Sequence, residues 1–415
     1  MKSVKTIVTG ISVKTTVLRK VIRKASYQYR YWRYKLRGAG KSVDEKKVVF
    51  SSFTGRKYAD SPRAIYEYMV NSDEYKDYKF VWVFTQPQNY DFLTKNRNTT
   101  VVKQASKECE VAFATAKYWV LNHRVSMHRA PTDKQVFIQT WHGTPLKRLG
   151  NDIEISDNDA FTRRELVDIY VTDAKKYTYF LSPSAFASEK FISAFQLKSL
   201  GKEDIIVEEG YPRNDFLMNY TAADVARIKA ELGIPEGKKV ILYAPTWRDN
   251  QFNTDIGGYT YKTEVDFDRL QKELGSEYVI LFRAHYFVSN AFDFAKYEGF
   301  VYNVSTLDDI NELYVVSDML ITDYSSVFFD YALIKRPILF FMYDFEMYKN
   351  EMRGFYIDID ELPGPIVKTE DELLEQIGNL SKDFTYDEKY RNFNGKFNYL
   401  DDGHASERVV HRLIK

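Results

Sequence analysis

The sequence predicts an α/β protein with two doubly wound domains, each built on a parallel sheet. Short, nearly continuous apolar runs recur in two series along the chain, separated by longer amphipathic stretches. Such runs are typical of parallel strands that helices cover on both faces. The chain has 415 residues, more than a single hydrophobic core usually serves. Polar motifs follow several of the runs directly, at the edge where open α/β sheets bind their ligands.

Eight apolar runs are the expected strands. The first series comprises residues 48–52, 80–84, 118–121 and 136–140. The second series comprises residues 240–243, 278–282, 319–322 and 337–341. Between the first two strands we expect a helix, with Ser61 as its N-cap and Pro62 as its first helical residue.

The expected seam between the two domains is the turn-rich stretch at residues 210–215, which separates the two series. The N-terminal domain would then span residues 46–215 and the C-terminal domain residues 216–400. A C-terminal helix is expected at residues 401–415.

Residues 1–45 form a basic and aromatic arm. Twelve Lys and Arg and no acid precede Asp44, so residues 44–415 carry a net charge of −11 although the whole chain stands at +1. Apolar residues between positions 17 and 22 recur at helical spacing, and Tyr and Trp gather between positions 27 and 34. Cations beside Tyr and Trp suit the headgroup layer of an anionic membrane, which we expect residues 1–43 to contact. A solvated arm is one alternative and nucleic-acid binding another, but the acidic remainder of the chain argues against nucleic acid.

The composition excludes several other classes of protein. Hydrophobic residues make up 44% and charged residues 28% of the chain, which is normal for a protein that folds in water. A single cysteine, Cys109, cannot form an internal disulfide; we expect it to be a buried bystander thiol, and a cytosolic location fits. No run reaches the ~18–20 apolar residues of a membrane-spanning helix. The N-terminus also lacks the apolar core and cleavage site of a signal peptide.

No cofactor and no metal are expected. The chain has neither a Walker motif nor a GxGxxG turn, so the sequence supports neither an ATPase nor a nicotinamide enzyme. Asp249 and Asp323 follow expected strands, but no dense group of carboxylates accompanies them.

His142 is the first candidate for a catalytic base. It follows the expected strand at residues 136–140 and precedes Gly143, which allows close backbone approach, and Thr144, which with Pro145 could begin a helix. Histidine can accept a proton near neutral pH. Lys147 and its cationic neighbour would lower the pKa of the imidazole and keep it neutral. A purely structural histidine is the alternative.

Polar residues after three strands of the second series are candidates for an anion site. Arg283 and His285 are two positions apart and would point the same way on an extended strand, where both can bind an anion; a buried salt bridge is the alternative for this pair. Ser325 and Ser326 begin an expected helix, either as N-caps or as hydroxyl donors to a phosphate.

Another polar pair follows the strand at residues 240–243. Thr246 and Arg248 fall where side chains of a cleft would lie. A loop anchored by Pro245 and Trp247 is the alternative for this stretch.

Together these motifs resemble the CDP-glycerol glycerophosphotransferase family, whose members prime or polymerise the glycerol-phosphate or ribitol-phosphate chains of teichoic acids and related capsules. The resemblance spans roughly residues 46–412 and keeps the order of the family's motifs. The matching segments are Phe50–Phe53 with Gly55-Arg56 and Ser61-Pro62, and residues 139–147, 210–215, 244–249, 283–285, 322–330 and 402–408.

The resemblance implies a GT-B type fold, with the active site between two Rossmann-like domains, on the cytoplasmic face of the membrane. It also implies a direct, metal-independent transfer in which His142 deprotonates the acceptor hydroxyl. The positions that would bind the CDP-alditol donor or its phosphates are Arg283, His285, Ser325, Ser326, Asp330, Thr246, Arg248 and Arg213. A structural acid, one turn into a helix, is the alternative for Asp330. Gly143, Thr144 and Lys147 would support the acceptor side.

The expected reaction moves glycerol phosphate or ribitol phosphate from CDP-glycerol or CDP-ribitol to a hydroxyl of a lipid-linked acceptor, with release of CMP. Only about 45 residues precede the catalytic pair of domains, where polymerases of this family often carry a further domain. This favours a compact primase-like or capsule-type member, or a short polymerase. A GT-B glycosyltransferase that uses a nucleotide sugar is the enzymatic alternative, and a membrane-surface scaffold with a degenerate site is the non-enzymatic one.

Overall fold

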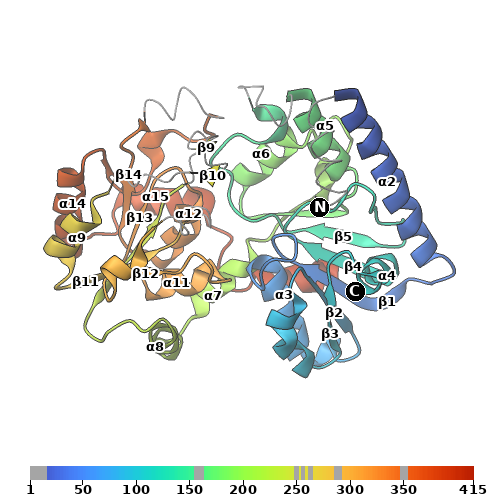
Figure 1. Cartoon of the computed structure of the whole chain (residues 1–415), viewed down its shortest axis with the longest axis horizontal. Coiled ribbons are helices and arrows are strands. Elements are labelled where there is room, and N and C mark those ends of the chain that lie inside the picture. Colours follow the sequence, from blue (N-terminus) through green and yellow to red (C-terminus); the bar gives the residue numbers. More distant parts are fainter. Residues whose placement is uncertain are drawn as a thin grey trace, which may run out of the picture.

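Two parallel sheets, each covered by helices, face one another in the molecule (Figure 1). The computed structural model describes residues 16–153, 163–246, 252–253, 258–259, 265–284, 292–345 and 354–415. In these residues the two sheets have seven and six strands, and all their strand pairs are parallel. The predicted fold class is thereby confirmed.

The N-terminal sheet has the strand order β3-β2-β1-β4-β5-β6-β7. Its strands are β1 (Asp44–Ser51), β2 (Lys79–Phe84), β3 (Thr99–Lys103), β4 (Ala116–Leu121), β5 (Val136–Gln139), β6 (Tyr179–Ser182) and β7 (Ile206–Glu208). The C-terminal sheet has the order β12-β11-β8-β13-β14-β15. Its strands are β8 (Lys239–Ala244), β11 (Tyr278–Phe282), β12 (Val301–Asn303), β13 (Met319–Thr322), β14 (Ile338–Phe341) and β15 (Ile366–Val367). A short antiparallel pair, β9 (Phe252–Asn253) and β10 (Gly258–Tyr259), lies apart from both sheets.

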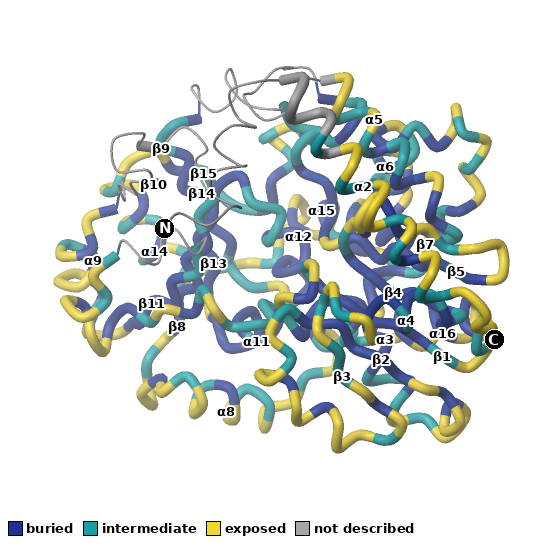
Figure 2. Tube along the Cα trace, turned by 45° about the vertical axis from the view of Figure 1, so that its right-hand side comes forward, coloured by how far each residue is buried: buried dark blue, intermediate teal, exposed yellow. Residues whose placement is uncertain are grey.

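The helices fill the connections between strands and flank the sheets. They are α2 (Thr16–Gly38), α3 (Asp60–Asn71), α4 (Lys107–Thr115), α5 (Arg163–Ala174), α6 (Ala185–Ala194), α7 (Asp215–Asn219), α8 (Ala222–Glu231), α9 (Phe267–Leu274), α11 (Ile310–Val316), α12 (Val327–Tyr331), α14 (Glu370–Asp383), α15 (Glu388–Phe397) and α16 (Ala405–Leu413). Figure 2 shows that the central strands are buried (dark blue), whereas the outer helix α8 is largely exposed (yellow).

Each sheet buries apolar side chains on both faces, which explains why its strands are nearly continuous apolar runs. In β1, Val49 packs with Trp119 on one face, whereas Val48 and Phe50 pack with Phe80 on the other. The central strands of the second sheet are divided between two clusters in the same way.

The strand order places a topological switch point in each sheet. Chain order runs outward from β1 to β2 and β3 on one side and resumes with β4 on the other. The second sheet repeats this pattern around β8, which lies between β11 and β13. Ligands of doubly wound sheets bind beyond the carboxyl ends of the strands at such points. The fold therefore directs attention to the loops that follow β1, β4, β8 and β13.

All eight predicted strands are present, with ends that differ by up to four residues. Two local predictions are wrong. Ser61 does not cap α3, because the helix already begins at Asp60, directly after Ala59. Instead, the Ser61 hydroxyl accepts a hydrogen bond from the backbone N–H of Arg213 at 3.4 Å. Thr144 and Pro145 do not begin a helix, because this segment runs on to form a bridge between Lys147 and Phe355 of the other domain.

The basic N-terminal segment forms a helix that packs against the N-terminal domain. On α2, Arg33 Nε and Arg37 Nε contact the two carboxylate oxygens of the buried Glu110, at 3.0 Å and 2.8 Å. Tyr34 of the same helix is buried. Nowhere in the described chain is a helix both long and apolar enough to span a membrane.

The C-terminal helix α16 returns to the N-terminal domain, where it packs against α3 (Figure 1). Val409, Val410 and Leu413 join the apolar cluster that contains Phe80. The Tyr118 hydroxyl donates a hydrogen bond to the Lys415 carbonyl at 2.6 Å. Helices α2 and α16 thus both pack on the N-terminal domain.

Replacement of Leu413 by alanine should lower the free energy of unfolding by about 2–5 kcal/mol, because it leaves a cavity in this cluster. Leu36→Ala on the exposed face of α2 is the control and should change it by less than about 0.5 kcal/mol. Urea denaturation measures both values. Equal stability of the two variants would show that α16 does not pack against the N-terminal domain.

Candidate active site

A cavity of about 440 Å³ lies between the carboxyl ends of the two sheets. Loops that follow β5, β8, β11 and β13 form its wall, as expected for ligand sites of doubly wound domains. It brings together eight of the residues predicted from the sequence: His142, Gly143, Thr144, Lys147, Thr246, Arg283, Ser325 and Ser326. Arg248 and His285 lie outside the described residues.

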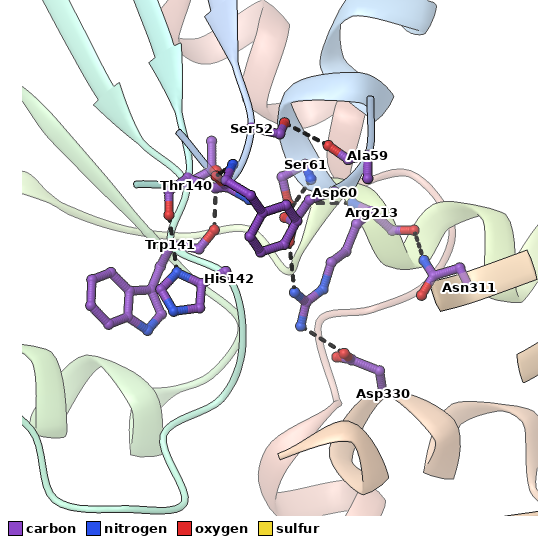
Figure 3. A network of polar contacts seen from close by, with 12 residues as sticks. Ser52, Ala59, Asp60, Ser61, Thr140, Trp141, His142, Arg213, Asn311 and Asp330 are labelled. Atoms are coloured by element: carbon purple, nitrogen blue, oxygen red, sulfur yellow. Dashed lines mark hydrogen bonds and ion pairs between the residues drawn. The ribbon is translucent and has the colours of Figure 1, made fainter. Parts of the chain in front are cut away.

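The His142 imidazole is held in one tautomer. Its Nδ1 lies 3.0 Å from the Asn122 carbonyl oxygen. A carbonyl oxygen only accepts hydrogen bonds, so Nδ1 carries the proton and Nε2 keeps a free lone pair. Its ring stacks on Trp141 with a centroid distance of 4.5 Å (Figure 3). The Phe53 ring lies 6.3 Å away.

The surroundings of His142 favour its neutral form. The side chain is exposed to the cavity, but protein from both domains surrounds it. Burial lowers the pKa of the imidazole, and this outweighs the opposing effects of the Asn122 hydrogen bond and the charge of Asp60. A neutral imidazole with a bare Nε2 can accept a proton, so the ring is able to act as a base.

Gly143 lies close to the C-terminal domain at the cavity. A Cβ atom at this position would lie 3.3 Å from the Ser326 Oγ and 3.6 Å from the Arg213 Nη2. The first of these contacts is tight even for a methyl group, so the glycine allows the loop that carries His142 to lie close to the loop that carries Ser326. His142 therefore lies beside the second domain although it belongs to the first.

Ser325 and Ser326 end a loop that is tied to its neighbour. The Asp323 Oδ1 accepts hydrogen bonds from the Thr246 N–H at 2.8 Å and the Tyr324 N–H at 2.6 Å. This carboxylate therefore joins the loops after β8 and β13. Ser326 precedes α12, but its hydroxyl makes no capping hydrogen bond, so the N-cap interpretation is not realised. Both serines are half-buried at the cavity wall.

Arg283 supplies positive charge to the same wall. Its Nη1 donates hydrogen bonds to the Val304 and Leu307 carbonyl oxygens, each at 3.0 Å. No described carboxylate lies within ion-pair distance of its guanidinium, unlike in the salt-bridge alternative. Burial lowers the pKa of Arg283, which nevertheless stays charged at neutral pH because guanidinium groups titrate far above it. A half-buried cation that pairs with no carboxylate among the described residues suits an anionic ligand.

Arg213 and Asp330 form a buried ionic bridge beside the cavity. Arg213 Nη2 lies 2.6 Å from Asp330 Oδ2 of the C-terminal domain, and its Nη1 lies 3.1 Å from Asp60 Oδ2 of the N-terminal domain (Figure 3). The Asn214 amide reaches both Asp330 and Asp401. In the structure these two predicted donor-binding residues bind one another, and their direct contact with a donor stays a prediction.

The sequence-based prediction missed two residues that shape the site. Asn122 directly follows β4, so the rule that singled out other polar residues after strands would have found it. Asp60 begins a helix after a loop, and its ion pair with a residue 153 positions away has no signal in the local sequence. In the part of the chain that the structure describes, no group of three or more His, Cys, Asp or Glu could hold a metal ion.

Several known proteins are similar to this chain in sequence and in fold. A family model described as CDP-Glycerol:Poly(glycerophosphate) glycerophosphotransferase matches residues 34–415. The teichoic acid poly(glycerol phosphate) polymerase of Bacillus subtilis (strain 168) is 42% identical over 376 residues, which cover 90% of this chain and 49% of that protein. The polymerase of the same name from Bacillus spizizenii (strain W23) is 40% identical over 373 residues, which cover 89% of this chain and 92% of that protein.

A solved structure of the wall teichoic acid polymerase TagF is similar along the whole chain. It superposes with a TM-score of 0.83 at 38% sequence identity, covering 100% of this chain and 98% of that one. The chain spans about half the length of the Bacillus subtilis polymerase. Because the family model covers both sheets and the cavity between them, the chain belongs to the CDP-glycerol:poly(glycerophosphate) glycerophosphotransferase family.

Proposed function

We propose that the protein transfers glycerol phosphate from CDP-glycerol to the end of a poly(glycerol phosphate) chain, as a teichoic acid polymerase. The relatives that match about nine-tenths of the chain are named for glycerol phosphate, which favours CDP-glycerol over CDP-ribitol. The observation that carries the proposal is that His142, whose Nε2 is unprotonated, lines a cavity whose other wall bears two serine hydroxyls and Arg283, which pairs with no carboxylate among the described residues.

The proposed reaction is a direct displacement at phosphorus. A terminal hydroxyl of the acceptor attacks the donor phosphorus that bears glycerol, and a new P–O bond forms. The bond from this phosphorus to the bridging oxygen breaks, and CMP leaves with the electron pair. His142 Nε2 takes the proton of the hydroxyl. Such transfers depend mainly on alignment and on neutralisation of phosphate charge.

We assign the donor phosphates to the C-terminal wall. Arg283, Ser325 and Ser326 can supply one cation and two hydroxyl donors there. Thr246 lies in the same wall, and we include Arg248 and His285 on the family resemblance alone. On the acceptor side, Thr144 and Lys147 line the cavity together with His142.

We further propose that α2 holds the protein as a peripheral protein at the cytoplasmic face of the membrane, next to a lipid-linked acceptor. Three large side chains of α2 face solvent: Tyr29, Trp32 and Leu36 are 66%, 61% and 73% exposed. Their spacing of three and four residues puts them on one face of the helix. Arg33 and Arg37 hold the helix to the protein through Glu110. An outward aromatic stripe with neighbouring cations suits an anionic lipid surface.

His142→Gln should lower kcat by at least about 10³-fold, because the amide cannot take the proton of the acceptor hydroxyl. The dissociation constant for CDP-glycerol, measured by calorimetry, should stay within about threefold of the wild-type value, because the substitution replaces the base and leaves the contacts to the donor in place. His404→Gln, at an exposed histidine on the surface, is the control and should keep full activity.

The product of the wild-type assay separates the alternatives. CMP and a ladder of glycerol-phosphate chains by mass spectrometry support the polymerase, and a single added unit would make the protein a transferase of limited extent. UDP released from a nucleotide sugar would overturn the proposal. Unchanged activity of His142→Gln would remove the imidazole from the mechanism.

Replacement of Tyr29, Trp32 and Leu36 by serine should weaken binding to vesicles with anionic lipid by about 10-fold or more, because the apolar contact with the bilayer is lost. Vesicle sedimentation measures this partition. Phe92→Ser, which removes an exposed aromatic ring from another surface, is the matched control and should bind as the wild type does. Equal loss in both variants, or none in the triple variant, would show that this face of α2 is not the membrane contact.

A further inference from the structure

The backbone that carries His142 has an unusual conformation. Trp141, the preceding residue, has a φ of +53°. Residues with a Cβ rarely adopt this left-handed region, so the surroundings must hold it there. The Trp141 indole is wedged against Phe180, Phe191 and Phe195, at centroid distances of 5.9, 5.8 and 5.3 Å. Because the indole also stacks on the imidazole, the conformation of Trp141 sets the direction of His142.

The carboxamide of Gln139 stabilises this turn by hydrogen bonds. Gln139 is the last residue of β5 and is fully buried. Its Oε1 accepts a hydrogen bond from the backbone N–H of Trp141 at 2.9 Å, and its Nε2 donates one to the His123 carbonyl oxygen at 3.2 Å. One side chain thus satisfies a donor on the loop after β5 and an acceptor on the loop after β4. These two hydrogen bonds need one acceptor atom and one donor atom on the same side chain, and a carboxamide provides both.

The loop after β4 is the one that binds the imidazole. The Asn122 carbonyl, which accepts the His142 Nδ1–H, belongs to the residue just before His123. The Asn122 Oδ1 in turn accepts the Phe53 N–H at 2.8 Å. Gln139 therefore constrains His142 twice, through the backbone that carries the ring and through the loop that receives its proton.

We propose that Gln139 is a positioning residue for the transfer reaction. It fixes the imidazole with Nδ1–H on Asn122 and with Nε2 turned toward the cavity. Gln139 itself does not line the cavity, so it acts through Trp141 and the loop after β4 and does not touch the substrates. This inference rests on the proposed role of His142 as the base.

Gln135 offers a matched control on the same strand segment. Its carboxamide is also buried, and its Nε2 donates to the Phe113 and Ala116 carbonyl oxygens at 2.8 and 2.7 Å. Its Oε1 accepts the Thr132 N–H at 3.1 Å. Gln139→Met and Gln135→Met therefore each remove a buried carboxamide of the same size, but only Gln139 connects to His142.

The test combines steady-state kinetics with ¹⁵N NMR of the imidazole, in full-length protein labelled at histidine. The His142 signals are assigned by their loss in His142→Gln. In Gln139→Met, kcat should fall by about 10- to 100-fold with KM for CDP-glycerol within about twofold, as expected for a misaligned base. The ¹⁵N shifts of His142 should move away from the Nδ1–H tautomer. In Gln135→Met, kcat per folded molecule and these shifts should match the wild type.

Gln139→Glu is a second variant in case Gln139→Met does not fold. An ionised carboxylate cannot donate to the His123 carbonyl, but a protonated one can, and burial raises the pKa of carboxyl groups. The ratio of its kcat to that of the wild type should therefore rise as the pH falls. A ratio that does not change with pH would count against the proposal.

The proposal is overturned if Gln139→Met keeps the wild-type ¹⁵N shifts of His142, or loses no more kcat than Gln135→Met. The NMR outcome is independent of the proposed function. If the wild type transfers no glycerol phosphate, the function fails, whereas the His142 shifts still report whether Gln139 orients the ring.

Discussion

Arg213 lies between two carboxylates that belong to different domains, and the geometry of the cavity depends on this contact. Asp60 begins α3 of the N-terminal domain, and Asp330 lies in α12 of the C-terminal domain, four residues after Ser326. All three side chains are buried. Each charge would be costly alone in this environment, so the three are stable only when they remain together. Arg213 also lies beside Gly143, so the bridge adjoins the loop that carries His142 and, through Asp330, the helix that follows Ser326.

The electrostatics around this bridge are those of a buried network with more acids than bases. Burial raises the pKa of Asp330, and the Arg213 guanidinium only partly opposes this. Burial also raises the pKa of Asp401, to about 7, while the Tyr211 N–H and the Asn214 amide act in the opposite direction. Asp401 precedes α16, the helix that returns to the N-terminal domain. The segment in which the chain passes back to this domain is therefore part of the same network.

Two further sets of contacts join the two domains. In the first, Arg63 of α3 contacts Asp309 and Glu312 at 3.3 and 3.2 Å, and the Lys57 ammonium donates to the Leu307 carbonyl at 2.7 Å. In the second, the Tyr356 N–H donates to the Leu146 carbonyl at 2.9 Å. These contacts join the two domains around a cavity whose lining includes both His142 and Ser326. This arrangement brings the proposed base of one domain next to the proposed anion site of the other.

The sequence predicted the parts of the fold that have a local signal. Eight of the strands were found because they are nearly continuous apolar runs, whereas β3, β6, β7, β12 and β15 were not predicted. Of these, β7 and β12, of three residues each, are too short and too mixed to stand out. Polar residues after strands were found by the same logic, because sheet topology gathers carboxyl ends. The positions of Arg213 and Asp330 were found through family motifs, but their pairing across 117 positions has no local pattern. Gln139 was noticed only as part of a motif, because its task depends on the φ of a neighbour.

The most direct test of the central claim compares the unfolding free energies of Arg213→Met and of the triple variant Asp60→Asn, Arg213→Met, Asp330→Asn. Arg213→Met should be about 3–5 kcal/mol less stable than the wild type, because it leaves two buried carboxylates without their cation. The triple variant should regain a large part of this loss, since no buried charge remains at the site. A triple variant no more stable than Arg213→Met alone would contradict the claim that these three charges hold the two domains together.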